Sequence, residues 1–151
     1  MKAKDIMIRD VYQVGENATV REVIKHFITH RISGLPVVNE AGEIAGYISD
    51  GDIMRYIGKH QDIIIDSILT VGIISGDDKS FSERVQGVLD LDVHHVSKRK
   101  IITIDAESEA EDVAAVLGKK QIKKLPVTKD GKLVGIISRG DVIRHTFEKL
   151  L

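Results

Sequence analysis

The chain of 151 residues contains no cysteine and only two prolines. Without cysteine it has no means to form disulfides, thiolate metal sites or a cysteine nucleophile. It also lacks an excess of either charge, because 22 basic residues stand against 23 acidic ones. No overall field therefore favours nucleic acid or an anionic membrane, and we expect no nucleic-acid partner.

Long hydrophobic runs are missing as well. The most apolar stretch, residues 63–74, is interrupted by polar residues and a glycine, and it is much shorter than the ~20 residues of a membrane-spanning helix. Residues 1–12 carry charges throughout, which is untypical of a signal peptide. The sequence therefore predicts a cytoplasmic protein without membrane insertion.

The common motifs of catalysis are absent too. The sequence has no Gly-x-Ser-x-Gly, Walker or His-Glu-x-x-His pattern, and its glycines occupy turns and close-packing positions instead of a phosphate-binding loop. We therefore expect no enzyme activity, no catalytic residue and no required cofactor.

The sequence does contain an internal repeat. Residues 32–38 (ISGLPVV) reappear as residues 122–128 (IKKLPVT), and residues 46–55 (GYISDGDIMR) reappear as residues 135–144 (GIISRGDVIR). Both prolines occupy matching places in the two copies. The matches keep the same order along the chain, so the halves are expected to share one fold.

Each copy predicts the same series of elements. A short β-rich run at residues 11–14 or 101–104 precedes an amphipathic helix, a hairpin of two strands and a second helix that opens at Asp50 or Arg139. The predicted fold class is α/β (α+β), with two pseudo-symmetric β-α-β-β-α units packed through their sheets. Neither half alone has much apolar area to bury, so each supplies the other's missing face.

The repeat divides the chain into a first motif (1–57), a connecting segment (58–91) and a second motif (92–151). We expect one or two helices in the connecting segment, one of them announced by the capping-box pattern Ser80-x-x-Glu83. The run at 63–74 fits a helix or a buried segment equally well, because periodicity alone does not decide between them.

The two copies resemble the CBS-domain family, whose motifs pair into a Bateman module. The family signature of glycine, two hydrophobic residues, Ser or Thr, two further residues and Asp stands here as residues 46–52 and again as residues 135–141. The resemblance covers nearly the whole chain apart from roughly residues 58–80. The chain is thus similar to a tandem CBS-domain protein.

The resemblance implies a regulatory sensor that binds AMP, ADP, ATP or S-adenosylmethionine in a cleft between the motifs, with up to two sites. The alternative is a ligand-free module that dimerises or acts on a partner protein. With or without a ligand, a homodimer is expected, because modules of this family commonly pair through their helices. The run at 63–74 also favours a dimer, since it is unusually apolar for a connecting segment. A separate effector protein is a possible partner.

The family's binding positions carry over to matching residues of this chain. Ser49 with Asp52, and Ser138 with Asp141, are expected at the ribose, since a carboxylate accepts hydrogen bonds from both vicinal hydroxyls. Backbone near one proline would meet adenine in each site. By resemblance, the nucleotide-binding residues are Val11, Tyr12, Gly34, Leu35, Pro36, Ser49, Asp52, Arg55, Ile101, Ile102, Lys124, Leu125, Pro126, Ser138, Asp141 and Arg144.

Plainer interpretations stand beside these. The Ser-x-x-Asp pairs also suit helix N-caps, and Arg55 and Arg144 either contact phosphate or remain solvated. The side chains of Lys119, Lys120, Lys123 and Lys124 either gather phosphates or compensate a helix dipole. If they gather phosphates, the second cleft should prefer more phosphates, and Asp141 should matter more there than Asp52.

The adjacent residues His94 and His95 raise the question of a metal site. Adjacent residues on a strand point to opposite faces, and without carboxylate or cysteine partners at ligand spacing the pair is expected to be a surface or hydrogen-bonded histidine pair. The sequence therefore predicts no metal site.

Overall fold

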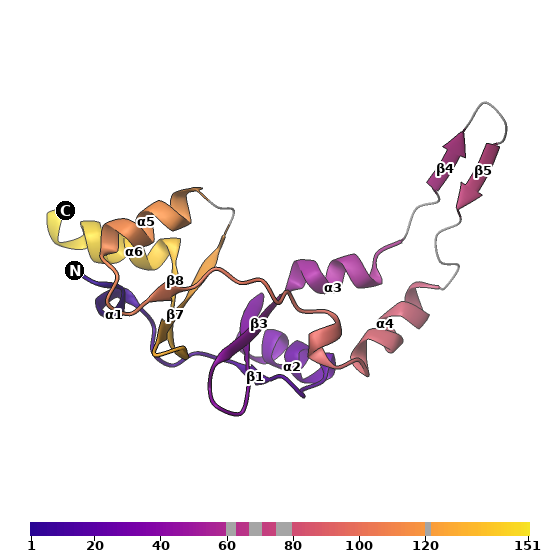
Figure 1. Ribbon diagram of the computed structural model, residues 1–151, viewed down its shortest axis with the longest axis horizontal. Helices are drawn as coiled ribbons and strands as arrows, with labels where there is room; N and C mark the ends of the chain where they lie inside the picture. The colour runs from indigo at the N-terminus through magenta and orange to yellow at the C-terminus, as the bar shows by residue number, and fades with distance from the viewer. Residues whose placement is uncertain (60–62, 67–70, 75–79, 120–121) are drawn as a thin grey trace.

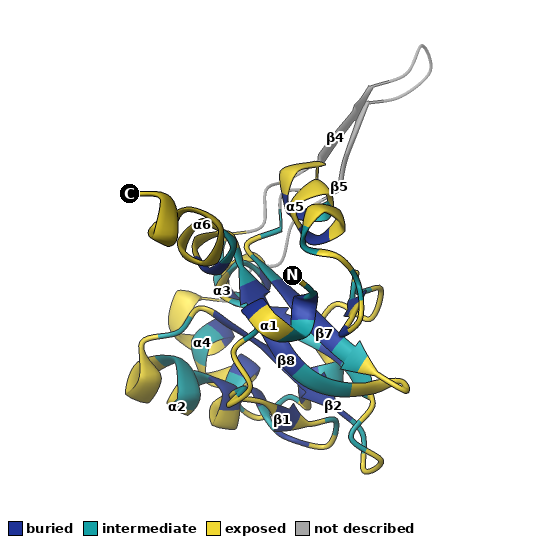
Figure 2. Cartoon of the chain, turned by 90° about the vertical axis from the view of Figure 1, so that its left-hand side faces the viewer, coloured by how far each residue is buried: buried dark blue, intermediate teal, exposed yellow. Residues whose placement is uncertain are grey.

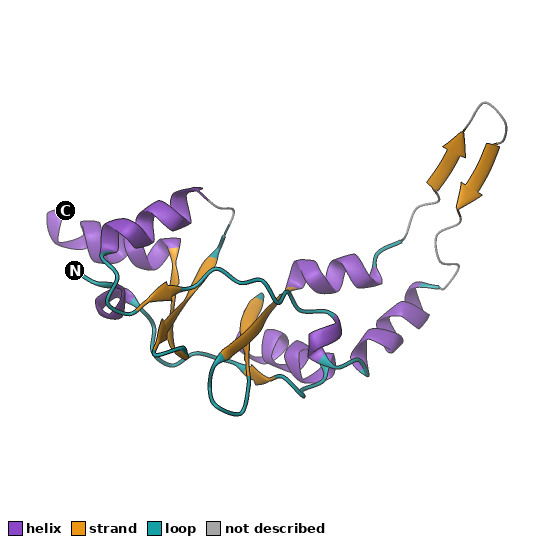
Figure 3. Cartoon of the chain, viewed as in Figure 1, coloured by secondary structure: helices purple, strands orange, loops and turns teal. Residues whose placement is uncertain are grey.

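The computed structural model describes residues 1–59, 63–66, 71–74, 80–119 and 122–151. Two α/β units lie beside each other, with their sheets toward the middle and helices toward the two ends (Figures 1 and 3). This arrangement confirms the predicted fold class. Among the described residues, no helix is long and apolar enough to cross a membrane.

The first unit contains three strands in the order β1-β2-β3. Strand β1 pairs with β2 in parallel and β2 with β3 antiparallel, with Gly34 opposite Ser49. Its elements are α1 (Ala3–Ile6), β1 (Val14–Gly15), α2 (Val20–His30), β2 (Gly34–Val38), β3 (Ile44–Ser49) and α3 (Asp50–Ile57). From β1 onward the unit follows the predicted β-α-β-β-α order.

The second unit repeats this plan, with strands in the order β6-β7-β8 and Lys124 opposite Ser138. Its elements are η1 (Val93–His95, a 3-10 turn), β6 (Ile104–Asp105), α5 (Ala110–Lys119), β7 (Lys124–Lys129), β8 (Lys132–Ser138), α6 (Arg139–Phe147) and the 3-10 turn η2 (Glu148–Leu150). The strands predicted at 11–14 and 101–104 are shorter than expected. Each begins only at the last residue of its run, and the residues before it have no regular structure.

The connecting segment contains a two-stranded hairpin and a helix. Strands β4 (Ile63–Asp66) and β5 (Val71–Ile74) pair antiparallel, so the described residues of the run at 63–74 form two short strands and not a helix. The sequence of residues 75–79 (SGDDK) predicts an exposed loop, and these residues lie outside the described part of the chain. Helix α4 (Phe81–Leu89) confirms the capping box, with the Glu83 N–H donating to Ser80 Oγ at 3.1 Å.

A proline lies within the central strand of each sheet. Pro36 stands opposite Tyr47, but Tyr47 exchanges both of its backbone hydrogen bonds with Lys98 at 2.9 Å. The N–H that Pro36 lacks would thus point to the other side of β2, where β1 pairs only with Val37 and Val38. Because no ladder bond is lost at that position, the strand tolerates the proline.

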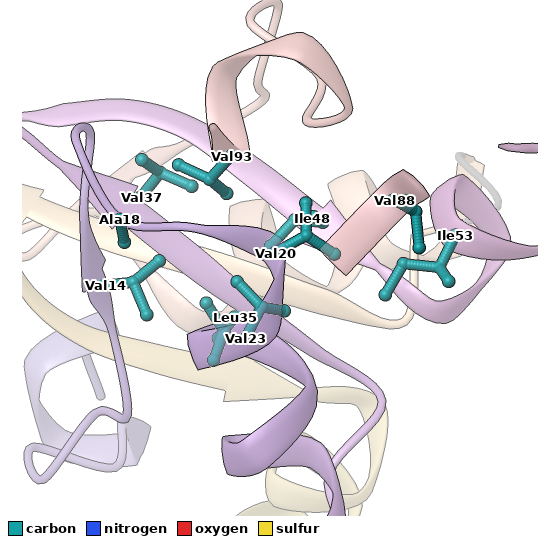
Figure 4. Packing of buried hydrophobic residues seen from close by; sticks show 10 residues of the cluster. All are labelled: Val14, Ala18, Val20, Val23, Leu35, Val37, Ile48, Ile53, Val88 and Val93. Carbon is teal, nitrogen blue, oxygen red and sulfur yellow. The ribbon is translucent and has the colours of Figure 1, made fainter. Parts of the chain in front are cut away.

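Two hydrophobic cores hold the units, and each borrows residues from the other half of the sequence. The first cluster includes Val88 and Val93 beside Leu35 and Ile48 (Figure 4). The second contains Ala3 and Ile6 together with residues from β6 onward, namely Ile104, Ala106, Val113, Leu117, Leu125, Val127 and Ile137. Helix α1 therefore packs into the second unit, while α4 and η1 pack into the first.

Backbone hydrogen bonds also join the units directly. The Ile8 N–H donates to the Ile136 carbonyl at 2.9 Å, as the Lys98 N–H does to the Tyr47 carbonyl. These two pairs are equivalent under the repeat. Figure 2 shows the result, with buried residues along β7 and β8 and exposed residues on the outer faces of the helices.

Candidate functional site

A cleft of about 350 Å³ opens between the two units. This volume lies within the range of about 300–1,000 Å³ that small-molecule sites occupy. Its lining residues are Ser33, Tyr47, Ser49, Asp50, Lys98, Lys100, Ile101, Ile102, Ile122, Lys123, Lys124 and Pro126. We call it the composite cleft, because its walls come from both motifs.

The composite cleft brings together some of the expected residues in a different grouping. Ile101, Ile102, Lys124 and Pro126 belong to the second motif, but the serine beside them is Ser49 of the first. From the sequence, Lys123 and Lys124 were expected in the same cleft as Ser138 and Asp141. Among the described residues, however, neither Ser138 nor Asp141 lines the composite cleft.

The crossover of the chain explains this grouping. The segment that leads from η1 toward β6 passes Tyr47, to which Lys98 is fixed by two backbone hydrogen bonds. Lys100, Ile101 and Ile102 follow at once and lie across from the end of β3, where Ser49 opens α3. The first motif thus contributes a helix N-terminus, and the second contributes the apolar wall.

Asp52 and Asp141 complete the capping boxes of α3 and α6, whose N-cap residues are Ser49 and Ser138. Asp52 Oδ2 accepts hydrogen bonds from the Ser49 N–H at 2.9 Å and from Ser49 Oγ at 3.1 Å. Asp141 Oδ2 accepts the same pair from Ser138 at 2.8 and 2.9 Å. The two aspartates are only 6% and 4% exposed. The capping interpretation is therefore confirmed, and a ribose role would have to use the acceptor capacity that remains on each carboxylate.

Arg55 and Arg144 also turn toward the caps. Each guanidinium forms an ion pair with Oδ1 of the aspartate one turn earlier, Asp52 or Asp141. The arginine side chains are 64% and 66% exposed. Neither arginine lines the composite cleft among the described residues, so the first role of both is to neutralise a buried carboxylate.

The composite cleft is strongly basic. Lys98, Lys100 and Lys123 are exposed at its rim and Lys124 is half-buried, against the single exposed carboxylate of Asp50. Lys119 is not among its lining residues, and Lys120 lies outside the described part of the chain. Four ammonium groups around one opening favour an anionic ligand.

Tyr47, which belongs to strand β3, lines this cleft. Burial, with smaller contributions from the charges of Asp50 and Asp52, raises the pKa of its phenol to about 12, so the hydroxyl stays neutral. A Cβ added at Gly34 would come within 2.6 Å of the Tyr47 hydroxyl. The lack of a side chain at Gly34 therefore leaves room for the Tyr47 ring. This role differs from the contact with adenine that was expected for Gly34.

The other expected residues lie away from the composite cleft. The side chains of Leu35 and Leu125 belong to the two cores, so only their backbones remain for a ligand. Tyr12 stacks on His30 with ring centroids 3.9 Å apart. Val11, Gly34 and Pro36 belong to the equivalent face of the first motif, where Ile8 and Asp10 replace Lys98 and Lys100. That face is accordingly less basic.

Several lining residues were missed by the sequence argument, namely Ser33, Tyr47, Asp50, Lys98, Lys100 and Ile122. Lys98 and Lys100 did leave a signal, because they immediately precede the apolar pair Ile101-Ile102. Tyr47 occupies the first of the two hydrophobic positions of the family signature, and Asp50 occupies the unspecified position after its serine.

The premise used for His94 and His95 was wrong. The two residues lie in the 3-10 turn η1 and not on a strand. Their ring centroids are 4.3 Å apart, and Asp92 offers a carboxylate oxygen within 4.8 Å of a nitrogen on each ring. Adjacent residues here do share one side of the chain.

Comparison with known proteins is consistent with this geometry. The sequence model of the CBS domain matches residues 3–59 and again residues 93–148. An uncharacterized protein of Methanocaldococcus jannaschii, MJ1426, is 34% identical over 95% of this chain and 89% of its own length. CBSX1 of Arabidopsis thaliana, a chloroplastic CBS domain-containing protein, is 27% identical over 92% of this chain and 60% of its own length.

A similar solved structure is CBSX2 of Arabidopsis thaliana in complex with AMP. It superposes with a TM-score of 0.74 at 20% identity, covering 99% of this chain and 98% of that one. At this identity the likeness shows the fold alone.

Proposed function

The chain belongs to the CBS-domain family as a tandem pair of CBS motifs, and from this premise we propose that it is a regulatory, non-catalytic module that binds an adenine nucleotide in the composite cleft. The observation that carries the proposal is the meeting of an apolar wall, a helix N-terminus and four lysines around one opening. AMP bound to the similar protein CBSX2 supports the ligand class.

Each part of the ligand has a matching part of the cleft. The flat faces of the adenine ring fit against Ile101, Ile102 and Pro126, while the ribose lies toward the Ser49 hydroxyl at the start of α3. Lysines draw the phosphates, and the positive end of the α3 helix dipole lies at the same opening. We assign the lysine-rich site to Ser49 and not to Ser138.

The charge of the composite cleft discriminates among the candidate ligands. AMP, ADP and ATP are anions, whereas S-adenosylmethionine carries a sulfonium cation and has no phosphate. The lysines at positions 98, 100, 123 and 124 therefore favour the nucleotides over S-adenosylmethionine, and they favour ADP or ATP over AMP as long as the added phosphates reach the ammonium groups.

Thermal unfolding in the presence of AMP, ADP, ATP, S-adenosylmethionine and plain adenosine tests the proposal. A ligand at 100 times its dissociation constant stabilises the folded state by about 2.7 kcal/mol. We expect the melting temperature to rise with the nucleotides and to change least with adenosine and S-adenosylmethionine. A chain that is stabilised by none of the five compounds would refute the proposal.

A ligand-free interaction module is the second candidate, and exposed apolar side chains favour it. Met54 on α3 and Ile143 on α6 occupy equivalent places in the repeat, and each is 57% exposed. Such residues are typical of a surface that pairs with another chain. We propose a homodimer through these helices in either case, so only nucleotide binding separates the two functions.

The cytoplasmic location and a separate effector protein remain proposals as well. The relative CBSX1 is chloroplastic by its name, so members of the family work in more than one compartment. Localisation of a fluorescent fusion would test the first, and affinity purification with and without nucleotide would test the second.

A further inference from the structure

The turn formed by residues 92–95 carries three metal-ligating side chains on one side. Asp92, His94 and His95 each offer one ligand atom, and these atoms lie within 4.8 Å of one another. The two imidazole centroids are 4.3 Å apart and tilted by 35°. Around a tetrahedral zinc ion with bonds of about 2.0–2.1 Å, neighbouring ligand atoms stand ~3.4 Å apart. Because Asp92 and His95 are exposed, rotation of their side chains is free to close the difference.

The backbone beneath these side chains is held on both sides. The Val93 N–H donates to the Ala18 carbonyl at 2.8 Å, and the Val20 N–H donates to the Leu91 carbonyl at 2.9 Å. Within the turn, the His95 N–H donates to the Asp92 carbonyl at 3.0 Å, and the Val93 side chain is fully buried in the first core. The ligands therefore project from a fixed backbone, which lowers the entropy cost of gathering them.

The other copy of the repeat shows what these positions do when they serve the fold alone. Lys2 and Lys4 are the counterparts of Asp92 and His94, and both pair with Glu107, at 3.0 and 2.8 Å. In the first unit Asn17 stands where Glu107 would be. Within the part of the chain that the structure describes, Asp92, His94 and His95 make no side-chain hydrogen bond or ion pair, so their donor atoms remain open to a metal.

The surroundings do not oppose a cation. His94 borders a cavity of about 280 Å³ whose lining includes Glu16 and Arg99, so the charges at this edge cancel. Two imidazoles and one carboxylate suit borderline divalent ions such as Zn²⁺, Co²⁺ and Ni²⁺. Three protein ligands leave at least one coordination position for water.

We propose that Asp92, His94 and His95 bind one divalent transition-metal ion per chain, at a surface site separate from the composite cleft. None of its three residues lines the composite cleft, so a metal ion and a nucleotide would occupy different sites of one module.

Titration calorimetry with Zn²⁺ alone tests the site, using the full chain without an affinity tag in a buffer that does not chelate metal. We expect one equivalent to bind, and His94→Ala, His95→Ala and the near-isosteric Asp92→Asn each to weaken binding by at least about tenfold. The matched control is His26→Ala with His30→Ala, which removes the histidine pair on α2 and should leave Zn²⁺ affinity unchanged.

A second measurement needs no variant. In NMR spectra of the wild type, Zn²⁺ should shift the ring resonances of His94 and His95 before those of His26, His30 or His145. The proposal is overturned if Zn²⁺ binds more weakly than about 1 mM. It is equally overturned if binding survives in the folded His94→Ala, His95→Ala double variant, or if the control variant is the one that loses it.

Discussion

Replacing either capping aspartate should destabilise the fold by a similar amount. Asp52→Ala removes an acceptor that holds the N–H and hydroxyl of Ser49 at 2.9 and 3.1 Å, and Asp141→Ala removes the matching acceptor from Ser138. Hydrogen bonds to a charged group contribute about 1.5–3 kcal/mol, and the exposed arginine partner adds ~0–1 kcal/mol. We expect each variant to lose about 1.5–4 kcal/mol, the sum of these two contributions.

Urea unfolding followed by circular dichroism measures this loss. In a chain of this length 1 kcal/mol corresponds to about 2–4 °C in melting temperature, so a fall of about 3–16 °C should accompany the loss. The matched control is Asp90→Ala, because Asp90 pairs with Arg21 at 3.2 Å but is 81% exposed along its side chain. It should change stability by less than about 1 kcal/mol. Losses from both capping variants no larger than that of the control would refute the capping argument.

Three further predictions concern single side chains. Ser49→Ala should weaken nucleotide binding in the composite cleft by about 2–12-fold, the equivalent of one neutral hydrogen bond, while titration calorimetry of Ser138→Ala should show the wild-type affinity. Burial raises the Tyr47 pKa to about 12 from about 10 in the unfolded chain, so the stability that the neutral phenol contributes is complete below about pH 10 and is lost as the pH rises toward about 12. Urea unfolding across this pH range should show a smaller loss of stability in Tyr47→Phe than in the wild type. An equal loss in the two proteins would contradict the raised pKa of Tyr47. Met54→Glu combined with Ile143→Glu should convert a dimer into a monomer in sedimentation, and a dimer that persists would move the interface elsewhere.

The repeat made the fold predictable. Paired motifs such as the two Leu-Pro-Val segments fixed the order of elements in both units, because periodicity and turn residues report local structure directly. The same local signals did not decide the secondary structure of residues 63–74, since a short apolar run suits a strand as well as a helix. Their separation into β4 and β5 depends on where the chain turns.

Local sequence patterns could not predict which residues meet in the composite cleft. Ser49 meets Lys100 and Ile101 because Lys98 bonds to Tyr47 across the two motifs, and such long-range pairings have no periodic signature in the sequence. The same holds for α1 and η1, which pack into the opposite unit. For His94 and His95 the sequence argument assumed a strand, whereas the chain forms a 3-10 turn that brings both rings to one side.

The claim that phosphates are held by the lysines of the composite cleft has one direct test. Calorimetric titration with ADP should compare the wild type with a double variant that carries both Lys123→Gln and Lys124→Gln. A control double variant carries Lys25→Gln and Lys129→Gln, at exposed residues that do not line the cleft. Both double variants lose the same net charge, so a general field effect cancels. We predict a loss of at least about tenfold in the first variant, since each charge-assisted bond contributes about 1.5–3 kcal/mol, and no more than a small change in the control. Equal affinities for ADP in the two variants would contradict the account.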